Sequence, residues 1–230
     1  MPLIDLIFPK KCINCRRFGE FICADCFAKI RYSDSLQCPV CGRPALNGMT
    51  HPGCSNRYSL DGAISVVAYN GIVKKLIYQF KYNPHLSKLA DTMGELMVEG
   101  LSQNESFYAF VEKYEPVLIP IPLSAKRLRE RGYNHAELLA SYVAKYFKLK
   151  VVRNVLSRTK DTKPQYKLNR ESRIKNLENA FEIRANQEVP KSAIIIDDIA
   201  TSFATLKEAA KVLKHADAQK VLGVTFAREI

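Results

Sequence analysis

The residues best suited to chemistry are seven cysteines, which all fall before residue 55 of a 230-residue chain. They form pairs with two residues between the partners, and the last cysteine is paired in the same way with a histidine. This spacing lets both side chains of a turn point at one ion, and two such turns complete a tetrahedral zinc site. The candidate ligands are Cys12, Cys15, Cys23, Cys26, Cys38, Cys41, His51 and Cys54.

Eight ligands are enough for two structural zinc ions. A sequential grouping gives the first four ligands to one ion and the last four to the other, whereas a crossed grouping joins the first pair to the third. We favour the sequential grouping because each site then closes a shorter loop, which costs less entropy. The alternatives are buried free thiols for the cluster and an ordinary loop histidine for His51.

A second chemical pattern lies in the segment AIIIDDIATSFATLKEA, residues 193–209. An apolar run ends in two acids, and hydroxyl residues and an amphipathic pattern follow. This order predicts a strand, a turn and a helix whose unpaired N–H groups and positive dipole end bind phosphate. The acids suit sugar hydroxyls or a Mg²⁺ ion, and the alternative is that they only cap the helix. The predicted binding residues are Asp197, Asp198, Thr201, Ser202, Phe203, Ala204 and Thr205.

Basic residues are frequent in the stretches 124–131 and 157–175, and the formal net charge is +12. A basic chain attracts phosphate polyanions such as nucleic acid, although a solvated helix face is the alternative. Tyr133 and Tyr166 are candidates for stacking on bases, with core packing as the alternative. The candidate contacts for pyrophosphate or nucleic acid are Lys126, Arg127, Arg131 and Asn134.

The elements that must position these residues alternate along the chain after residue 60. The patterns predict strands over 63–70, 116–122, 150–152, 192–198 and 220–229, and helices over 71–82, 86–102, 124–147 with a break near Gly132, and 204–216. Alternating strands and helices indicate a parallel α/β sheet with helices on both faces. Because ligands in such sheets bind at the carboxyl ends of the strands, the acidic turn and the segment 120–131 are expected to meet.

Composition sets the limits for these interpretations. Hydrophobic residues are 47% of the chain and charged residues 25%, which fits one globular domain with a small appendage. Charges break every apolar run before about 18 residues, so no transmembrane span is predicted. The first residues, MPLIDLIFPKKC, contain an acid and lack a cleavage site, which favours a short amphipathic helix over a signal peptide. We therefore expect a cytoplasmic location.

Several segments together resemble a known family. IIIDDIATSFATL is similar to the phosphoribosyl-diphosphate (PRPP) signature of type I phosphoribosyltransferases. The resemblance to one branch, the ComF family, extends to LIYQFKY, PIPLSAKRLRERGYNHAELLA, RTKDTKPQYKLNRESRIKNLENAF, VTFARE and the cysteine module, which resembles its double zinc ribbon. The resemblance implies a double zinc-ribbon module over residues 1–58 and a phosphoribosyltransferase-like α/β domain over residues 59–230.

The resemblance also implies a function, in natural competence, handling incoming single-stranded DNA with the DNA-uptake machinery as partner. It implies that Asp197 and Asp198 bind the ribose hydroxyls of PRPP, that the loop hydroxyls bind its 5′-phosphate, and that Mg²⁺ accompanies the ligand. Arg131 and Asn134 would lie near the pyrophosphate. Two alternatives stay open, an active phosphoribosyltransferase with an unknown acceptor and a non-enzymatic zinc-ribbon adaptor. No catalytic residue is identified.

The chain departs from the family pattern at two positions. Phe203 stands where the family has glycine, and His135 where it has glutamine. Glycine permits close approach of the backbone to phosphate, and another residue at positive φ costs of order 1–2 kcal/mol. We therefore expect Phe203 to crowd the phosphate, which weakens the case for a transferase, and we expect Phe203→Gly to raise the affinity for a ribose phosphate.

Overall fold

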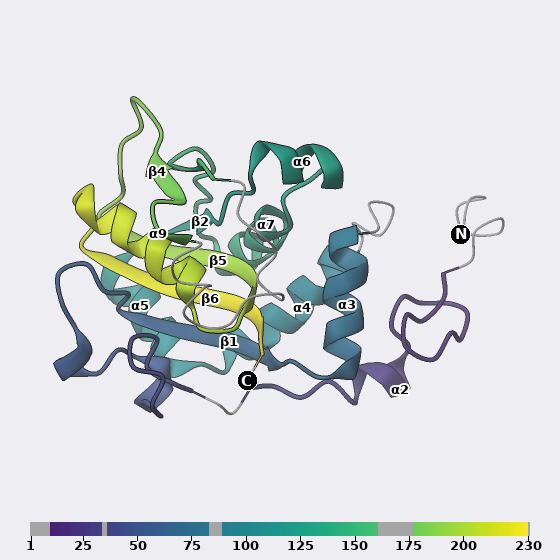
Figure 1. Ribbon diagram of the computed structural model, residues 1–230. Coiled ribbons are helices and arrows are strands. Elements are labelled where there is room, and N and C mark those ends of the chain that lie inside the picture. The colour runs from purple at the N-terminus through teal and green to yellow at the C-terminus, as the bar shows by residue number, and fades with distance from the viewer. Residues whose placement is uncertain (1–9, 34–35, 83–88, 161–176, 230) are drawn as a thin grey trace.

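The computed structural model describes residues 10–33, 36–82, 89–160 and 177–229. Its centre is a sheet in the order β1-β6-β5-β2, in which each neighbouring pair is parallel. Helices lie on both sides of this sheet (Figure 1), so the predicted α/β class is confirmed. The strands are β1 (Gly62–Ala68), β2 (Val117–Pro120), β5 (Ser192–Ala200) and β6 (Lys220–Arg228).

Helices and a small antiparallel ribbon surround the sheet. The helices are α2 (Ala24–Phe27), α3 (Gly71–Tyr82), α4 (Leu89–Ser102), α5 (Glu105–Tyr114), α6 (Ala125–Arg131), α7 (His135–Phe147) and α9 (Ala204–His215), with short 3₁₀ turns at Leu46–Gly48 and Pro52–Cys54. The ribbon pairs β3 (Leu156–Arg158) with β4 (Phe181–Ile183).

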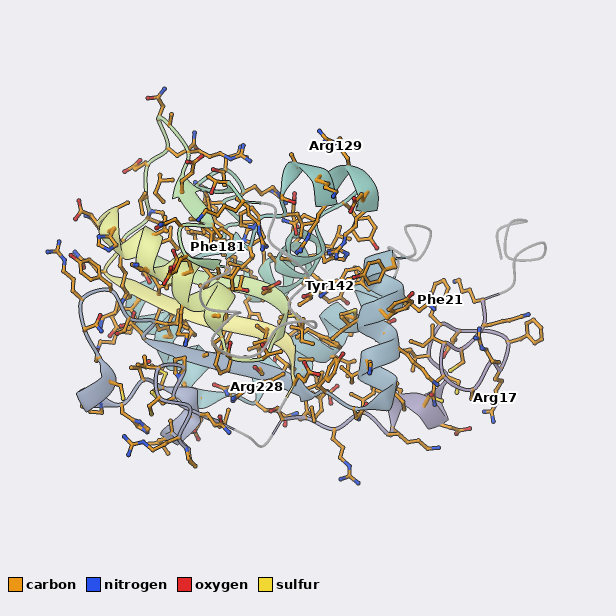
Figure 2. The ribbon with its side chains drawn as sticks, in the orientation of Figure 1. Arg17, Phe21, Arg129, Tyr142, Phe181 and Arg228 are labelled. Carbon is orange, nitrogen blue, oxygen red and sulfur yellow. The ribbon has the colours of Figure 1, made fainter. Side chains whose placement is uncertain are left out.

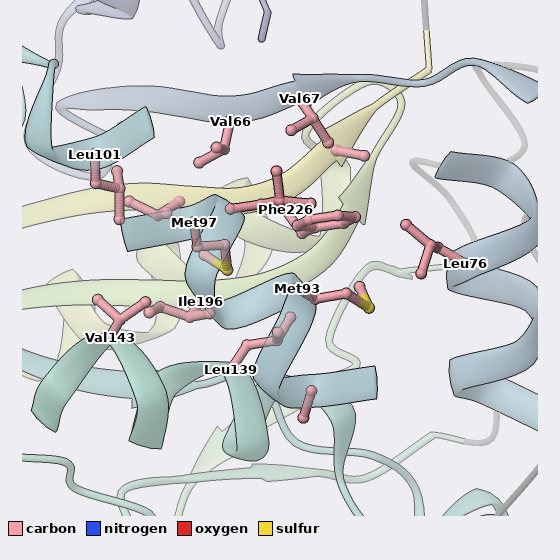
Figure 3. Packing of buried hydrophobic residues seen from close by; sticks show 14 of the residues in the cluster. Val66, Val67, Leu76, Met93, Met97, Leu101, Leu139, Val143, Ile196 and Phe226 are labelled. Carbon is pink, nitrogen blue, oxygen red and sulfur yellow. The ribbon is translucent and has the colours of Figure 1, made fainter. Parts of the chain in front are cut away.

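Both faces of the sheet are buried because successive side chains of a strand point to opposite faces. In β5, Ile194 and Ile196 belong to the cluster shared with α3, α4 and α7. Ala193 and Ile195 belong to the second cluster, which α9 and the β3–β4 ribbon cover. Figure 3 shows the first cluster, in which side chains of the sheet meet side chains of the helices, among them Ile196, Phe226, Met93, Met97 and Leu139. Burial on both faces explains the near-continuous apolar run of this strand.

Most of these helices begin at a residue whose side chain caps the first turn. Asn70 accepts from Val73 N–H at 3.0 Å, and Asn104 accepts from Phe107 N–H at 2.9 Å. The same kind of bond starts α6 at Ser124 and α7 at Asn134. Helix α9, like the short helix α2, begins without a side-chain cap, and its N-cap residue, Phe203, has a left-handed conformation (φ 55°, ψ 15°). The first N–H groups of α9 therefore lack the side-chain partner that α3, α5, α6 and α7 have.

The structure differs from the sequence-based elements at several boundaries. Strand β5 continues through both acids to Ala200, so the following loop is shorter than predicted. The strand predicted over 150–152 is a single parallel bridge between Val151 and Leu118. The break expected near Gly132 is present, and Gly132 ends α6 at φ 80°.

Two features were missed because their local patterns are weak. Helix α5 is short and buries Phe107 and Phe110, and aromatic residues are poor helix formers. The β3–β4 ribbon depends on pairing between distant segments, which no local period reveals. The predicted N-terminal amphipathic helix lies largely outside the described residues, as do the start of the helix predicted over 86–102, Tyr166, and most of the basic stretch 157–175.

The cysteine-rich segment lies along the outer edge of the sheet. Ser33 N–H donates to the Val66 carbonyl and Ala68 N–H donates to the Arg31 carbonyl, both at 2.9 Å. These bonds surround an antiparallel bridge between Tyr32 and Val67. The module therefore covers the open edge of β1, which would otherwise present unpaired backbone groups. No helix within the described ranges combines the length and apolarity needed to cross a membrane.

Candidate functional site

The eight candidate zinc ligands form two separate tetrads in the described chain. Within each tetrad the ligand atoms lie within 4.8 Å of one another, and the grouping is sequential, Cys12, Cys15, Cys23 and Cys26, then Cys38, Cys41, His51 and Cys54. Cys15 Sγ lies 3.5 Å from Cys23 Sγ, and Cys41 Sγ lies 3.4 Å from His51 Nδ1. Zinc bonds of about 2.0–2.3 Å in a tetrahedron require ligand separations of about 3.5–3.8 Å. The donor atoms therefore fit zinc.

The two tetrads are structural repeats of each other. Cys12 N–H donates to the Arg17 carbonyl at 2.8 Å, and Cys38 N–H donates to the Arg43 carbonyl at 2.9 Å. The second half of each tetrad repeats as well, since Cys26 N–H donates to the Cys23 carbonyl and Cys54 N–H donates to the His51 carbonyl, both at 2.9 Å. His51 thus occupies the position that Cys23 holds in the first tetrad.

The ring of His51 is oriented for metal binding. Its Nε2 lies 3.0 Å from the Pro44 carbonyl, which only accepts hydrogen bonds, so Nε2 carries the proton. The lone pair of Nδ1 then faces the thiols, an arrangement common for zinc-bound histidines. Hydrogen bonds from the backbone and then the side chain of Arg43 lower the pKa of Cys41 to about 6, which favours the thiolate that zinc binds.

The two acids lie at the carboxyl end of β5, as the sequence predicts. Asp198 is buried, and Asp197 is half-buried. Lys81, in the last turn of α3, places its Nζ 2.8 Å from Asp198 Oδ2. Asp197 Oδ1 accepts from the N–H of Asp198 at 2.8 Å. The acid pair therefore has a half-buried cation as an immediate neighbour.

The two carboxyl groups have opposite pKa shifts. Burial, and then the charge of Asp198, raises the pKa of Asp197 to about 7. For Asp198, burial acts to raise the pKa, but the positive charge and hydrogen bond of Lys81 outweigh burial and lower it. Asp198 is therefore ionised at neutral pH, whereas Asp197 takes up a proton more readily than an ordinary carboxylate. The acid pair thus carries less negative charge than its two carboxylates suggest.

His135 lies beside this pair and is 2% exposed. Its ring packs edge-on against Phe80, with the centroids 5.1 Å apart, and its Nδ1 lies 3.4 Å from Arg131 Nη1. Its Nε2 is buried without a hydrogen-bond partner in the described part of the chain. Burial, with smaller contributions from Arg131 and Lys81, lowers the pKa of His135 to about 4, so the ring is neutral at pH 7.

The loop after β5 is short and carries the predicted hydroxyl residues. Thr201, Ser202 and Thr205 are half-buried, and Ser202 Oγ is buried with no partner among the described residues. Phe203 is 4% exposed, and its ring belongs to the hydrophobic cluster beneath α9, together with Ala204. The ring therefore points into the core, and the expectation that it crowds the phosphate is wrong.

An arginine from another strand forms a cation–π contact with this aromatic ring. The guanidinium carbon of Arg228, at the end of β6, lies 4.5 Å from the centre of the Phe203 ring. Arg228 Nη2 also donates to Gln37 Oε1 at 2.6 Å, and Gln37 directly precedes the zinc ligand Cys38. Arg228 thus connects the second tetrad to the loop that precedes α9.

The basic residues separate into two groups. On α6, Lys126 and Arg129 are exposed and Arg127 is half-buried. Arg129 extends away from the body of the molecule in Figure 2. Arg131 turns toward the acid pair, where its guanidinium contacts His135 and lies 5.3 Å from the centre of the Tyr82 ring.

Two predicted contact residues have structural roles. Asn134 Nδ2 donates to the Ile121 carbonyl at 3.0 Å, and its Oδ1 accepts from the Ala136 N–H at 3.2 Å. Asn134 therefore ties the end of β2 to the start of α7. The hydroxyl of Tyr133 donates to the Phe80 carbonyl, and its ring packs against Phe80 and His135. Tyr133 thus packs against the core.

Two cavities in the described part of the chain lie away from the acid pair. One, of about 300 Å³, is lined by Val40, Tyr58 and the outer face of α9. The other, of about 410 Å³, lies at the amino ends of β5 and β6, where Lys214 Nζ is 2.7 Å from Asp61 Oδ2. Asp197 and Asp198 line neither cavity.

Comparisons with known proteins agree with both parts of this structure. A family model described as a double zinc ribbon domain matches residues 3–55. Competence protein F of Haemophilus influenzae is 26% identical, over 93% of this chain and 95% of its own. Competence protein ComFC of Bacillus subtilis is 28% identical, over 91% of this chain and 85% of its own. DNA utilization protein YhgH of Escherichia coli is 26% identical, over 94% of this chain and 96% of its own.

These similarities, which extend over more than nine tenths of the chain, support the resemblance to the ComF family. The double zinc ribbon provides two zinc-binding sites, one for each tetrad.

The candidate site contains residues that sequence reasoning missed. Lys81 was part of the motif LIYQFKY, but its pairing with Asp198 depends on how α3 packs against the sheet. Arg228 and Gln37 meet only because β6 ends beside the cysteine-rich module. The local sequence contained one signal for these residues, a cation at the end of an otherwise apolar helix face. This signal identifies Lys81 but neither Arg228 nor Gln37.

Proposed function

We propose that this chain is a competence protein that handles incoming single-stranded DNA during natural transformation and binds a ribose phosphate such as PRPP. The names of its relatives refer to competence or DNA utilisation, and the similarity extends over more than nine tenths of the chain. The structural observation that carries the proposal is a cationic helix, α6, near the acid pair. In this proposal residues 1–58 form the zinc module, residues 59–230 bind the ligands, and the protein acts in the cytoplasm beside the DNA-uptake machinery.

The DNA part of the proposal depends on charge. Lys126, Arg127 and Arg129 lie within two turns of one short helix, and α6 stands out from the body of the molecule in Figure 1. Cationic side chains on an accessible helix bind a phosphate backbone without reading its sequence. The net charge of +12 acts in the same direction by attracting polyanions from a distance.

The ribose phosphate part depends on the loop between β5 and α9. Carboxylate oxygens at the strand end accept hydrogen bonds from vicinal sugar hydroxyls. The phosphate then meets the uncapped first turn of α9 and the hydroxyls of Thr201, Ser202 and Thr205. The buried Ser202 Oγ, which has no hydrogen-bond partner among the described residues, supports this assignment, because such groups are normally hydrogen-bonded.

The DNA part is tested with a labelled single-stranded oligonucleotide and fluorescence anisotropy over a range of salt concentrations. We expect affinity to fall steeply with salt, and the triple variant Lys126→Gln, Arg127→Gln, Arg129→Gln to reduce the slope of log K against log salt by about 2. The control removes three exposed charges elsewhere, at Lys29, Lys113 and Lys145, and leaves most of the slope. Absence of binding by wild type at low salt would refute the DNA part.

The ribose phosphate part is tested by calorimetric titration with ribose 5-phosphate. Asp197→Asn is expected to weaken binding about tenfold, the equivalent of one lost hydrogen bond to a charged group. Asp217→Asn, an exposed acid on the loop after α9, serves as the matched control and retains wild-type affinity. Binding of DNA without ribose phosphate would favour the adaptor alternative, and release of pyrophosphate from PRPP would favour the transferase alternative.

A further inference from the structure

The acid pair lies next to a cation that belongs to the protein itself. Helix α3 ends at the carboxyl edge of the sheet, and its last turn places Lys81 Nζ 2.8 Å from Asp198 Oδ2. The side chain of Lys81 is 18% exposed and that of Asp198 is 6% exposed. A buried carboxylate requires a partner, and removal of one partner from a buried pair is strongly destabilising. Lys81 and Asp198 therefore form a fixed part of the site.

Two of the four carboxylate oxygens of the pair are already engaged. Asp198 Oδ2 receives the ammonium group of Lys81, and Asp197 Oδ1 receives the backbone N–H of Asp198. The guanidinium of Arg131, which contacts His135, adds a second positive charge near Asp198. Among the described residues, the other oxygen of each acid has no hydrogen bond or ion pair, and it is the one we assign to a ligand.

The residues of the acid pair do not fit a bound Mg²⁺ ion. Mg²⁺ requires near-octahedral oxygen ligands at about 2.1 Å, usually including one or two carboxylates. An ion on the carboxylate of Asp198 would lie within a few ångströms of the Lys81 ammonium, where like charges repel strongly in a buried environment. The negative charge of Asp198, which a divalent cation would neutralise, is therefore already neutralised by Lys81.

We propose that Lys81 takes the place of a divalent cation at the acid pair, so that the protein holds no Mg²⁺ there. The inference rests on the proposed function in one respect, that the ligand of this edge is a ribose phosphate. In that setting the two remaining carboxylate oxygens accept from the vicinal hydroxyls of the sugar, and Lys81 provides the charge balance. Binding of ribose 5-phosphate then needs no added metal.

The first experiment measures metal binding without any sugar. Zinc-loaded protein is titrated with Mn²⁺, a stand-in for Mg²⁺, and free Mn²⁺ is followed by electron paramagnetic resonance. Wild type and Asp198→Asn are expected to bind Mn²⁺ equally weakly. Lys81→Met is expected to gain a Mn²⁺ site about tenfold tighter, because an unneutralised buried carboxylate then attracts the ion. The double variant Lys81→Met, Asp198→Asn loses that site again.

The control variant is Lys81→Arg, which keeps the charge and is expected to bind Mn²⁺ as wild type does. Circular dichroism checks that each variant is folded. If Lys81→Met does not fold, the comparison of wild type with Asp198→Asn still decides the question. Tighter Mn²⁺ binding by wild type than by Asp198→Asn would overturn the proposal, and so would a folded Lys81→Met protein without the new site.

The second experiment titrates ribose 5-phosphate into zinc-loaded protein, in buffer without divalent cations and again with millimolar MgCl₂. The wild-type affinity is expected to change by less than about twofold, whereas Lys81→Met binds more weakly and is partly restored by MgCl₂. A strict Mg²⁺ requirement in wild type would overturn the proposal. Absence of sugar binding in both buffers would refute the proposed ligand, while the Mn²⁺ titration would still test Lys81.

Discussion

The guanidinium of Arg228 lies over the ring of Phe203, with 4.5 Å between the guanidinium carbon and the ring centre. This contact explains how a bulky residue occupies a position with φ 55° at the start of α9. The strain of the left-handed conformation, of order 1–2 kcal/mol, is offset by burial of the ring and by the cation–π contact. Because the ring faces the core, the side of this turn opposite the core is formed by backbone atoms and not by the Phe203 ring.

Replacing Phe203 with glycine should destabilise the protein. The change relieves about 1 kcal/mol of backbone strain but removes a buried ring worth about 3–5 kcal/mol, so the free energy of unfolding should fall by about 2–4 kcal/mol. Urea unfolding measures this change. Because the ring is in the core, the affinity for ribose 5-phosphate should change by less than about twofold, in contrast to the gain predicted from the sequence. A large gain in affinity would contradict this orientation of the ring.

The contact between Arg228 and Phe203 should appear as a coupling energy. A double-mutant cycle of Arg228→Met and Phe203→Leu isolates the pair from the other contacts of Arg228, including the one with Gln37. The expected coupling is about 1 kcal/mol in favour of the native pair. Urea unfolding of the four proteins provides the measurement, and strictly additive effects would show that the ring and the guanidinium do not interact.

Purified protein should contain about two zinc ions per chain, and His51→Ala should reduce this to about one. The reason is that His51 occupies the position of Cys23 in the second tetrad. His51→Cys should retain both ions, because a thiolate is an equally suitable ligand. The control His215→Ala changes a histidine that stacks on Tyr58 and belongs to neither tetrad. Elemental analysis showing two ions in His51→Ala would remove His51 from the ligand set.

Acid should destabilise the protein through His135. Burial lowers the pKa of His135 in the folded state to about 4, whereas the unfolded value is about 6.5. Between these values the unfolded chain binds more protons, so stability is lost as the pH falls. From about pH 7 to pH 5, wild type should lose about 2 kcal/mol more than His135→Gln, which cannot take up the proton. Urea unfolding at both pH values tests this, and equal losses would contradict it.

The sequence alone determined the features that depend on local spacing. The cysteine and histidine pairs predict two tetrads because ligand separation within a turn is a property of neighbouring residues. The period of Ile72, Leu76 and Phe80 predicts α3 over the residues it occupies, and the apolar run before Asp197 predicts β5. The alternation of these elements was sufficient to predict a parallel sheet with Asp197 and Asp198 at its carboxyl edge.

Only the tertiary structure decided which side chains meet at that edge. Lys81 reaches Asp198 because the end of α3 lies beside the carboxyl end of β5, and Arg228 reaches Phe203 because β6 lies next to β5 in the sheet. Gln37 and Arg228 are 191 residues apart in the chain, and no local period relates them. Strand order and packing bring together residues that are far apart in the sequence. They place Lys81 beside the charge of Asp198, and they turn the Phe203 ring toward the core.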